Sequence, residues 1–162
     1  MSERILVTGA GGFIGNHLVS FLKKKGYWVR GVDIKYPEFN NTTAYEFIFG
    51  NLTDSIVCNI VAQSIDNVYS LAANMGGIGY ITENNDANIM RDNVLINVNM
   101  AEASAKNKVK RLLYSSSACV YPTYRQNSLD GVLLSEEDAL PASPNEAYGW
   151  EKLFSELRYM AY

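Results

Sequence analysis

The segment AYGWEK places a phenol and an amine four residues apart, at Tyr148 and Lys152. On a helix, residues at this spacing share one face and lie one turn apart. A lysine near a phenol favours the phenolate and lowers the pKa of the tyrosine, so Tyr148 could act as a general base toward a substrate hydroxyl near neutral pH. The alternative is a surface tyrosine beside a solvated lysine, because this spacing is common by chance.

A second segment with reactive side chains, SSSACVYPTY (115–124), carries a run of hydroxyls followed by a thiol. Ser117 could hold the same substrate oxygen as Tyr148 through its hydroxyl. Cys119 could be a small buried apolar residue, which is where free cysteines usually lie. The segment alone does not explain why a thiol, rather than another small residue, follows the hydroxyls.

Three glycines, Gly9, Gly12 and Gly15, recur at intervals of three residues between a predicted strand, RILVT (4–8), and a predicted helix. Glycines permit a tight turn, a close approach of the backbone to a pyrophosphate, and close packing of the helix on the strand. The amino terminus of the helix would then offer N–H groups and a favourable dipole to the phosphates. These features together predict a dinucleotide-binding turn.

Asp33 ends the next predicted strand, WVRGVD (28–33). A carboxylate at this place can accept hydrogen bonds from the adenosine ribose hydroxyls and would repel a 2′-phosphate, which favours NAD over NADP as the cofactor. Lys35 weakens that preference. The alternative for Asp33 is an aspartate that only starts a loop.

Strand and helix patterns alternate along the chain and predict an α/β fold. Strands are expected at 4–8, 28–33, 45–49, 66–73 and 110–116, and helices at about 13–25, 54–64, 87–106 and from 148 onward, with a proline-containing loop before the last helix. The cap of the second of these helices is expected to be Asp54 or Ser55. The expected apolar stripes are Ile14, Leu18, Phe21 and Leu22 on the first helix and Val94, Val98, Ala101 and Ala105 on the long helix. The alternation predicts a Rossmann-like, doubly wound and mainly parallel sheet with helices on both faces, in one domain over 1–162.

The composition argues against several classes of function. The 162 residues carry a net charge of −3, with 48% hydrophobic and 19% charged residues, as in an ordinary globular domain. There is no long basic block and no apolar run of transmembrane length, so we expect neither a nucleic-acid partner nor a membrane partner. The amino terminus lacks a signal peptide pattern and Cys58 lies far from Cys119, which predicts a cytoplasmic protein with reduced thiols, Cys58 being part of the core. His17 is the single histidine, so we expect no metal site.

These segments together resemble the extended short-chain dehydrogenase/reductase superfamily, and within it the NAD-dependent epimerase/dehydratase family of nucleotide-sugar enzymes. The resemblance lies in TGAGGFIG (8–15), Asp33, LAA (71–73), Asn93, SSSACVYP (115–122) and YGWEK (148–152). It implies that Ser117, Tyr148 and Lys152 form a hydride-transfer triad and that Asn93 helps to organise it. The implied contacts with NAD are Gly9, Gly12, Phe13, Ile14, Gly15, Asp33, Asn51, Leu52, Leu71, Ala72 and Ala73, together with Tyr148 and Lys152. Asn51 replaces an aspartate that contacts adenine in the family, so we expect altered adenine recognition.

Two segments, AANMGGIGYI (72–81) and SSACVYP (116–122), resemble the GDP-mannose 3,5-epimerase family in particular. The first is similar to a substrate-side loop, which implies substrate contacts at Met75, Gly76, Gly77 and Ser117. The family has a cysteine at the position of Cys119. The resemblance therefore implies that, after NAD-dependent oxidation at C4 of a GDP-sugar, Cys119 moves a proton at C3 or C5. Relatives form homodimers through helices that correspond to 87–106 and 148–161, so we expect a homodimer.

Members of this family are much longer than this chain. A second acid/base residue and most contacts with the nucleotide sugar would lie beyond Tyr162, in a substrate domain, so we expect this chain to be an amino-terminal part of such an enzyme. Two alternatives remain open. One is an epimerase–reductase similar to GDP-fucose synthase, which prefers NADPH and is disfavoured by Asp33, and the other is a non-catalytic dinucleotide-binding module.

Overall fold

The computed structural model describes residues 2–76, 86–126, 133–144 and 146–162 of the chain. Their contacts divide the chain into two compact units. The sheet unit comprises Met1–Ala73, Leu95–Ser115 and Tyr162, and the helical unit comprises Asn74–Val94 and Ser116–Ala161.

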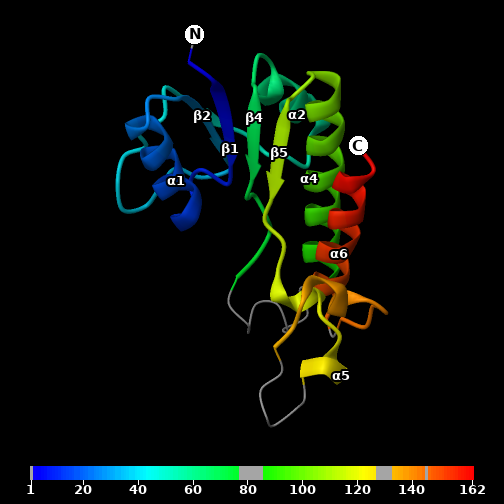
Figure 1. Cartoon of the computed structure of the whole chain (residues 1–162). Helices are drawn as coiled ribbons and strands as arrows, with labels where there is room; N and C mark the ends of the chain where they lie inside the picture. The colour runs from blue at the N-terminus through cyan, green and yellow to red at the C-terminus, as the bar shows by residue number, and fades with distance from the viewer. Residues whose placement is uncertain (1, 77–85, 127–132, 145) are drawn as a thin grey trace. The chain divides into compact units, whose positions relative to one another are not determined.

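Strands and helices alternate along the chain, as the sequence predicts (Figure 1). The elements are β1 (Arg4–Thr8), α1 (Phe13–Lys24), β2 (Trp28–Asp33), β3 (Glu46–Phe49), α2 (Ser55–Ala62), β4 (Asn67–Ser70), α4 (Asp86–Lys106), β5 (Arg111–Tyr114), η1 (Ala118–Val120), α5 (Thr123–Gln126), η2 (Glu136–Ala139) and α6 (Ala147–Met160). The bounds of β1 and β2 agree with the prediction. Asp54 caps α2 as expected, because its side chain accepts a hydrogen bond from the N–H of Ile56 at 2.8 Å.

The sheet unit contains five described strands in the order β3-β2-β1-β4-β5, and every neighbouring pair is parallel. The central strand β1 pairs with β2 on one side and with β4 on the other, so that Leu6 lies opposite Arg30 and opposite Val68. This arrangement confirms the predicted doubly wound, parallel α/β fold. It also brings the carboxyl ends of β1, β2, β3 and β4 to one edge of the sheet, where such folds bind their ligands.

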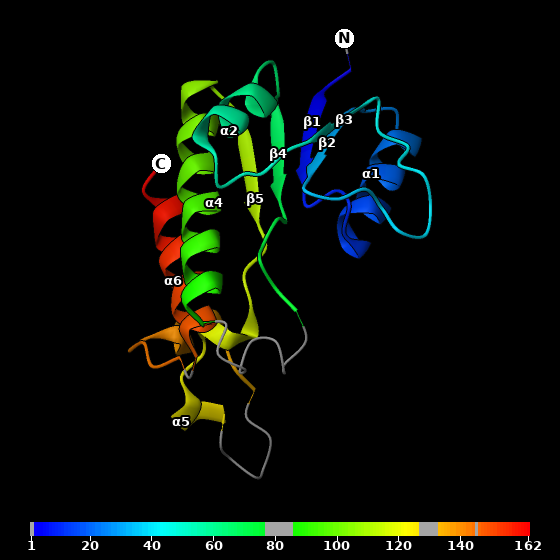
Figure 2. The ribbon, with the colours of Figure 1, turned by 180° about the vertical axis from the view of Figure 1, so that it is seen from behind.

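Side chains of β1 alternate between two apolar cores, as the period of a strand requires. Leu6 belongs to a core with residues of α2 and of the later part of α4, including Cys58 and Met100. Figure 2 shows α2 and α4 on this side of β4 and β5. Ile5 and Val7 point to the opposite face and pack with α1. The sheet is therefore covered by helices on both faces, as predicted.

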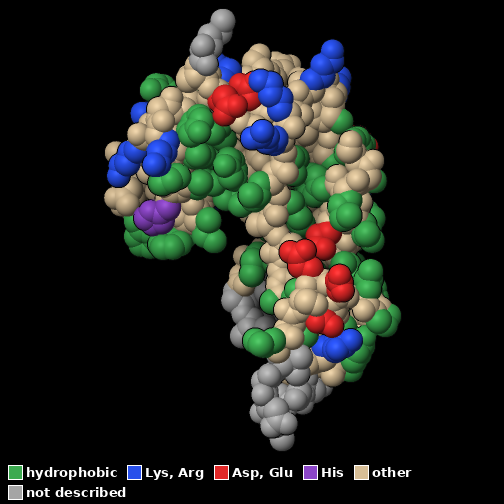
Figure 3. Space-filling model, in the orientation of Figure 1, with side chains coloured by type: hydrophobic (Ala, Val, Ile, Leu, Met, Phe, Trp, Pro, Cys, Tyr) green, Lys and Arg blue, Asp and Glu red, His purple; other side chains and the backbone are tan. Residues whose placement is uncertain are grey.

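The face that carries α1 is less completely covered than the other. Beyond the end of α1, a cavity of about 550 Å³ opens over β4 and β5, and hydrophobic side chains gather beside it (Figure 3). Its lining comprises Glu3, Ile5, Leu22, Tyr27, Asn67, Val68, Tyr69, Arg111, Leu112 and Leu113. The side chain of Leu113 remains 51% exposed there.

The fourth strand is shorter than the predicted 66–73. After Ser70, the N–H groups of Leu71 and Ala72 both donate to Oγ1 of Thr8, each at 3.0 Å. The Thr8 hydroxyl at the end of β1 thus accepts hydrogen bonds from two backbone N–H groups, which in a longer strand would bond to neighbouring strands. This side-chain contact stops β4 and holds the following residues against the end of β1.

Two predicted apolar stripes are wrong in detail. On α1 the buried residues are Gly15, Val19 and Leu22, whereas the side chains of Ile14 and Phe21 are 70% and 54% exposed. On α4, Ala101 is the one member of the predicted stripe that is buried, and Ala105 is exposed. The buried face of α4 also carries two asparagines, Asn93 and Asn97, which a count of apolar residues leaves out.

The helical unit is built from α6, the first turns of α4 and three short helices, η1, α5 and η2. These short helices fall in the segment that the sequence predicts as a loop. Their cores are small: Ile89 packs with Tyr148 and Cys119, and a second cluster contains Val120, Ala139 and Leu153. The helix α6 approaches η1 closely, because a Cβ on Gly149 would lie 2.2 Å from the carbonyl oxygen of Cys119.

Candidate active site

The glycine turn of the sheet unit is fixed by the backbone. Gly9 has a φ of +69°, a conformation that favours glycine, and its carbonyl accepts from the N–H of Gly12 at 3.1 Å. A Cβ on Gly15 would lie 2.1 Å from that same carbonyl oxygen, so helix α1 packs too closely on the turn for any larger residue. The predicted roles of Gly9 and Gly15 in a tight turn agree with this geometry.

Gly11 is a constrained residue of the turn that the sequence argument missed. Its N–H donates to Oδ2 of Asp33 at 2.8 Å, and a Cβ on it would lie 2.1 Å from the carbonyl oxygen of Lys35. The other carboxylate oxygen, Oδ1, accepts from the N–H of Lys35 at 3.1 Å. Asp33 therefore ties the turn to the end of β2, and its contact with a ribose stays a prediction. The two consecutive glycines at 11–12 could have indicated that Gly11 is also constrained.

The start of α1 is suited to a phosphate group. Gly12 is the N-cap residue and provides no side-chain hydrogen bond, and the first turn contains no acidic residue. The first N–H groups of the helix are thus not capped by a side chain, and a helix amino terminus attracts anions. The side chains of Phe13 and Ile14 are 74% and 70% exposed beside it. The residues present therefore fit a dinucleotide pyrophosphate.

The other predicted cofactor contacts follow β3 and β4 in the sheet unit. Asn51 is exposed, and its Oδ1 accepts from the N–H of Thr53 at 3.0 Å. Leu52 is buried in the core, and its carbonyl accepts from the Cys58 thiol at 3.1 Å. Leu71, Ala72 and Ala73 are half-buried beyond the end of β4. All of these residues lie after the carboxyl ends of strands, where the cofactor is expected.

In the helical unit, Ser117 begins the short helix η1. Its Oγ accepts from the N–H of Cys119 at 3.1 Å, which orients the hydroxyl at the amino end of η1. Cys119 is half-exposed and packs against Ile89 and Tyr148. The structure thus brings together three of the residues that the sequence assigns to catalysis, Ser117, Cys119 and Tyr148.

The environment of Tyr148 differs from the prediction. Its side chain is 3% exposed, and burial raises the pKa of the phenol, although a hydrogen bond with Ser117 opposes this. From the sequence we predict a pKa lowered by Lys152, and this is wrong for the protein alone, because burial of the phenol dominates and raises its pKa. Lys152 Nζ lies 5.6 Å from the centroid of the tyrosine ring. The phenol hydroxyl instead donates to Sδ of Met75 at 3.4 Å.

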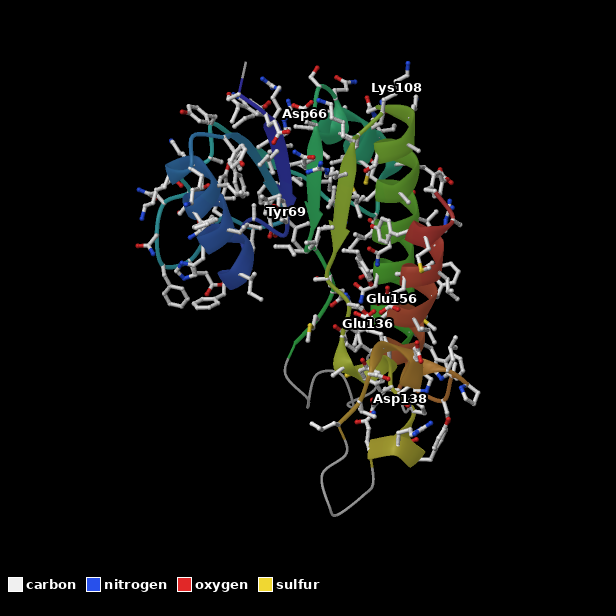
Figure 4. The ribbon with its side chains drawn as sticks, viewed as in Figure 1. Asp66, Tyr69, Lys108, Glu136, Asp138 and Glu156 are labelled. Atoms are coloured by element: carbon white, nitrogen blue, oxygen red, sulfur yellow. The ribbon has the colours of Figure 1, made fainter. Side chains whose placement is uncertain are left out.

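Lys152 is 3% exposed, and burial lowers the pKa of its amine. The carboxylates of Glu151 and Glu156 oppose this shift. Glu151 is fully buried and accepts from the Ser155 hydroxyl at 2.7 Å, while Glu156 accepts from the hydroxyl of Ser116 (Figure 4). Neither glutamate is predicted from the sequence. The position of Glu156, one helical turn after Lys152, could have indicated that the two side chains lie close together.

Asn93 is fully buried and holds the start of the predicted substrate-side loop. Its Oδ1 accepts from the N–H of Asn74 at 2.6 Å, and its Nδ2 donates to the carbonyl of Asn74 at 3.2 Å. Met75 and Gly76 follow directly in the chain, while Gly77 lies outside the described residues. Asn93 thus positions the backbone next to Met75, and its role in a catalytic site stays a prediction.

The two cysteines lie in different surroundings. Cys58 is buried in the sheet unit, and burial raises the pKa of its thiol to about 12. This confirms the prediction that Cys58 belongs to the core. Cys119 is half-exposed in the helical unit, so the residue singled out for proton transfer is the more accessible thiol.

Two further features concern the described residues, 2–76, 86–126, 133–144 and 146–162. No group of three or more His, Cys, Asp or Glu side chains in these ranges is arranged to hold a metal ion. No described helix combines the length and the apolar character needed to cross a membrane.

The chain is similar to a known family along almost its whole length. The NAD dependent epimerase/dehydratase family matches residues 5–162. GDP-mannose 3,5-epimerase 1 of Oryza sativa subsp. indica is 44% identical over 155 residues, and the GDP-mannose 3,5-epimerase of Arabidopsis thaliana is 43% identical over 155 residues. Both matches cover 94% of this chain but 40% and 41% of the relatives, so the chain spans about 40% of the length of these curated relatives.

The fold is also found among solved structures. MoeE5 in complex with UDP-glucuronic acid and NAD is 34% identical, with a TM-score of 0.78 over 98% of this chain and 48% of that chain. The start of α1, which no side chain caps, is suited to the phosphates of a dinucleotide cofactor. The chain therefore belongs to the NAD-dependent epimerase/dehydratase family, whose cofactor is NAD.

Proposed function

We propose that this chain is the cofactor-binding part of a nucleotide-sugar epimerase that uses NAD and acts on a GDP-sugar in the manner of GDP-mannose 3,5-epimerase. The observation that carries the proposal is the packing of Cys119 beside Tyr148, whose hydroxyl also interacts with Ser117. A phenol that can accept a hydroxyl proton and a thiol that can move a carbon-bound proton thus lie together. The curated relatives from rice and Arabidopsis support a GDP-sugar as the substrate.

Each residue has a separate task in this reaction. Bound NAD supplies the hydride acceptor at C4 of the sugar and the donor for the final reduction. Tyr148 accepts the proton of the C4 hydroxyl, while Ser117 hydrogen-bonds the same oxygen. The ketone formed at C4 acidifies the neighbouring C–H bonds, so that Cys119 as a thiolate can take a proton from C3 or C5 and give one back as a thiol. Inversion also requires an acid on the opposite face of the sugar.

The charge on Lys152 supports the phenolate of Tyr148 in this scheme. Burial disfavours the charged lysine, and Glu151 and Glu156 counteract it. In the protein alone the pKa of Tyr148 is raised, so base catalysis near neutral pH needs a further lowering when cofactor and substrate occupy the site. Their arrival can supply it, because a bound pyridinium and a substrate hydroxyl both favour the phenolate.

We further propose that two copies of the chain associate through α4 and α6. Large apolar side chains recur along α6 at intervals of three or four residues and remain exposed: Trp150 is 45%, Phe154 45%, Leu157 60% and Met160 81% exposed. Leu95 on α4 is 41% exposed. Both thiols are free, which supports a reducing, cytoplasmic location.

Solvent-deuterium exchange tests the proposal directly. The 162-residue chain, and a chimaera in which it is followed by the carboxyl-terminal remainder of the Arabidopsis relative, are incubated in D₂O with NAD and GDP-mannose. Mass spectrometry and NMR then locate deuterium in the sugar. We expect label at C3 and C5 from the chimaera, lost in its Cys119→Ser variant.

The other functions give different results in the same assay. A non-catalytic module leaves the sugar unlabelled although NAD binds, and an epimerase–reductase labels the sugar but requires NADPH to release its product. Label that survives Cys119→Ser unchanged overturns the role proposed for Cys119.

A further inference from the structure

The loop after β2 carries an ion pair beside the dinucleotide turn. Nζ of Lys35 donates to Oε1 of Glu38 at 2.8 Å, and the two side chains are 54% and 62% exposed. The pKa of Lys35 is raised and that of Glu38 is lowered, in each case chiefly by this hydrogen bond, so both groups are charged at neutral pH.

The ion pair borders a cavity of about 250 Å³ in the sheet unit. Its lining comprises Gly11, Gly12, Phe13, Asn16, His17, Lys35, Pro37, Glu38, Phe39 and Asn40. Gly11 is bonded to the carboxylate of Asp33, so the cavity adjoins the group expected to take the adenosine ribose hydroxyls. A phosphate on the 2′-oxygen of that ribose would have to enter this neighbourhood.

Lys35 is the one lysine or arginine among the lining residues, so it is the natural partner for a 2′-phosphate. In this chain Glu38 already engages it. Asp33, Lys35 and Glu38 together carry a net charge of −1, and a 2′-phosphate would add a further negative charge of about −1.5 to −2.

We propose that Glu38 is a specificity-determining residue for the cofactor: by holding Lys35, it denies this cation to a 2′-phosphate and thereby strengthens the preference of Asp33 for NAD over NADP. The inference rests on the dinucleotide binding in the proposed function and is independent of the sugar chemistry.

Calorimetric titration of the full 162-residue chain with NAD⁺ and with NADP⁺ at low salt tests the inference. In Glu38→Gln we expect the affinity for NADP⁺ to rise about fivefold, as expected for one exposed charge about 4 Å away in water, while the Kd for NAD⁺ changes less than about twofold. The gain should shrink as salt is added, because exposed charges are screened.

Two further variants show whether the effect acts through Lys35. In Lys35→Met/Glu38→Gln the gain for NADP⁺ should disappear, since the cation that Glu38 restrains is gone. Glu3→Gln removes the same charge before β1, away from the turn, and should leave both Kd values unchanged.

Several results overturn the inference. They are a ratio of the two Kd values that Glu38→Gln leaves within twofold of the original, an equal gain in the double variant, and an equal gain in Glu3→Gln. Failure of the parent chain to bind NAD⁺ overturns it together with the cofactor role, whereas absence of deuterium in the sugar leaves it standing and counts against the proposed epimerase function.

Discussion

The dinucleotide turn of the sheet unit is built from backbone, whereas the reactive cluster of the helical unit is built from side chains. In the turn, Gly9 adopts a positive φ, Gly15 abuts the carbonyl of Gly9, and Asp33 accepts hydrogen bonds from two backbone N–H groups. In the cluster, what matters is the burial of Tyr148 and Lys152. Recognition of the cofactor is therefore sensitive to any added Cβ, while the chemistry is sensitive to the surroundings of a few titratable groups.

The two regions also differ in how complete they are without a ligand. The turn already has its geometry, because close backbone contacts define it. In the cluster, burial raises the pKa of Tyr148 and lowers that of Lys152, so both shifts favour neutral groups. Under the proposed mechanism, partners that enter the site would have to stabilise the charged pair, whereas Glu151 and Glu156 already favour the charged form of Lys152.

The largest effect is expected from Gly15→Ala. The new Cβ would lie 2.1 Å from a backbone oxygen, so the turn must shift, and we expect a loss of about 1–3 kcal/mol of stability together with loss of measurable NAD⁺ binding. Gly12→Ala is the matched control, because its Cβ would meet the same oxygen at 3.3 Å and the fold should survive with weakened binding. Thermal denaturation and calorimetry measure the two effects, and normal NAD⁺ binding by Gly15→Ala would contradict a turn fixed by backbone contacts.

Tyr148→Phe should break the cluster without breaking the turn. The ring and its packing are kept while the acidic hydroxyl is lost, so we expect deuterium exchange in the chimaera to slow by about 10²–10⁴-fold. The Kd for NAD⁺ should change much less, since the turn lies in the sheet unit. Calorimetry and the exchange assay are run on the same preparation, and an equal loss in both would show that the two regions are not separable.

The two cysteines provide one thiol in each unit, Cys58 in the sheet unit and Cys119 in the helical unit. Cys58 is buried with a pKa raised to about 12, whereas Cys119 is half-exposed. At pH 8 we expect iodoacetamide to alkylate Cys119 at least about a hundredfold faster than Cys58, because the thiolate is the reactive species. Mass spectrometry of the intact chain measures the rates, with Cys119→Ser and Cys58→Ala to assign them. Equal rates would show that the core of the sheet unit opens as readily as the cluster.

At neutral pH the smallest effect is expected from the Cys58 thiol, whose influence on the stability of the sheet unit appears only at alkaline pH. The thiol of Cys58 ionises near its ordinary pKa when unfolded but at about 12 when folded, so the unfolded state binds fewer protons between pH 9 and pH 12. Stability should therefore fall as the pH rises through this window, by up to about 1.4 kcal/mol per pH unit. Denaturant unfolding at several pH values measures this slope, and Cys58→Ala should have a shallower one. Parallel slopes would remove Cys58 as its source.

The sequence predicted the fold class because its signals are local. Alternating strand and helix patterns placed β1 and β2 correctly, and Asp54 marked the start of α2. The end of β4 was not predictable in this way, because it depends on the hydroxyl of Thr8, more than sixty residues away in the chain. The buried faces of α1 and α4 were predicted incorrectly because they too depend on tertiary packing. A helix buries the face that meets the rest of the protein, and on α4 this face includes asparagines.

The candidate site was predictable to a similar depth. The spacing of Tyr148 and Lys152 and the glycine triplet located its two regions. The contact of Gly11 with Asp33, the bond between Ser116 and Glu156, and the raised pKa of Tyr148 were not predictable, because each arises from tertiary packing. Sequence patterns thus singled out candidate groups, whereas the surroundings of these groups became known only from the structure.

Because helices cover the sheet unevenly, we expect its strands to differ in the free energy of local opening. In β1, four of the five residues are buried, and the strand pairs on both sides. Among the described strands, β5 pairs only with β4, and none of its residues is buried. It lies beside the cavity that Tyr69, labelled in Figure 4, also lines. Amide hydrogens in β1 should therefore exchange with solvent only through global unfolding. Those in β5 should exchange through local openings of low free energy that leave the other strands folded. The dinucleotide turn, anchored on β1, β2 and the end of β4, should therefore keep its geometry while β5 opens.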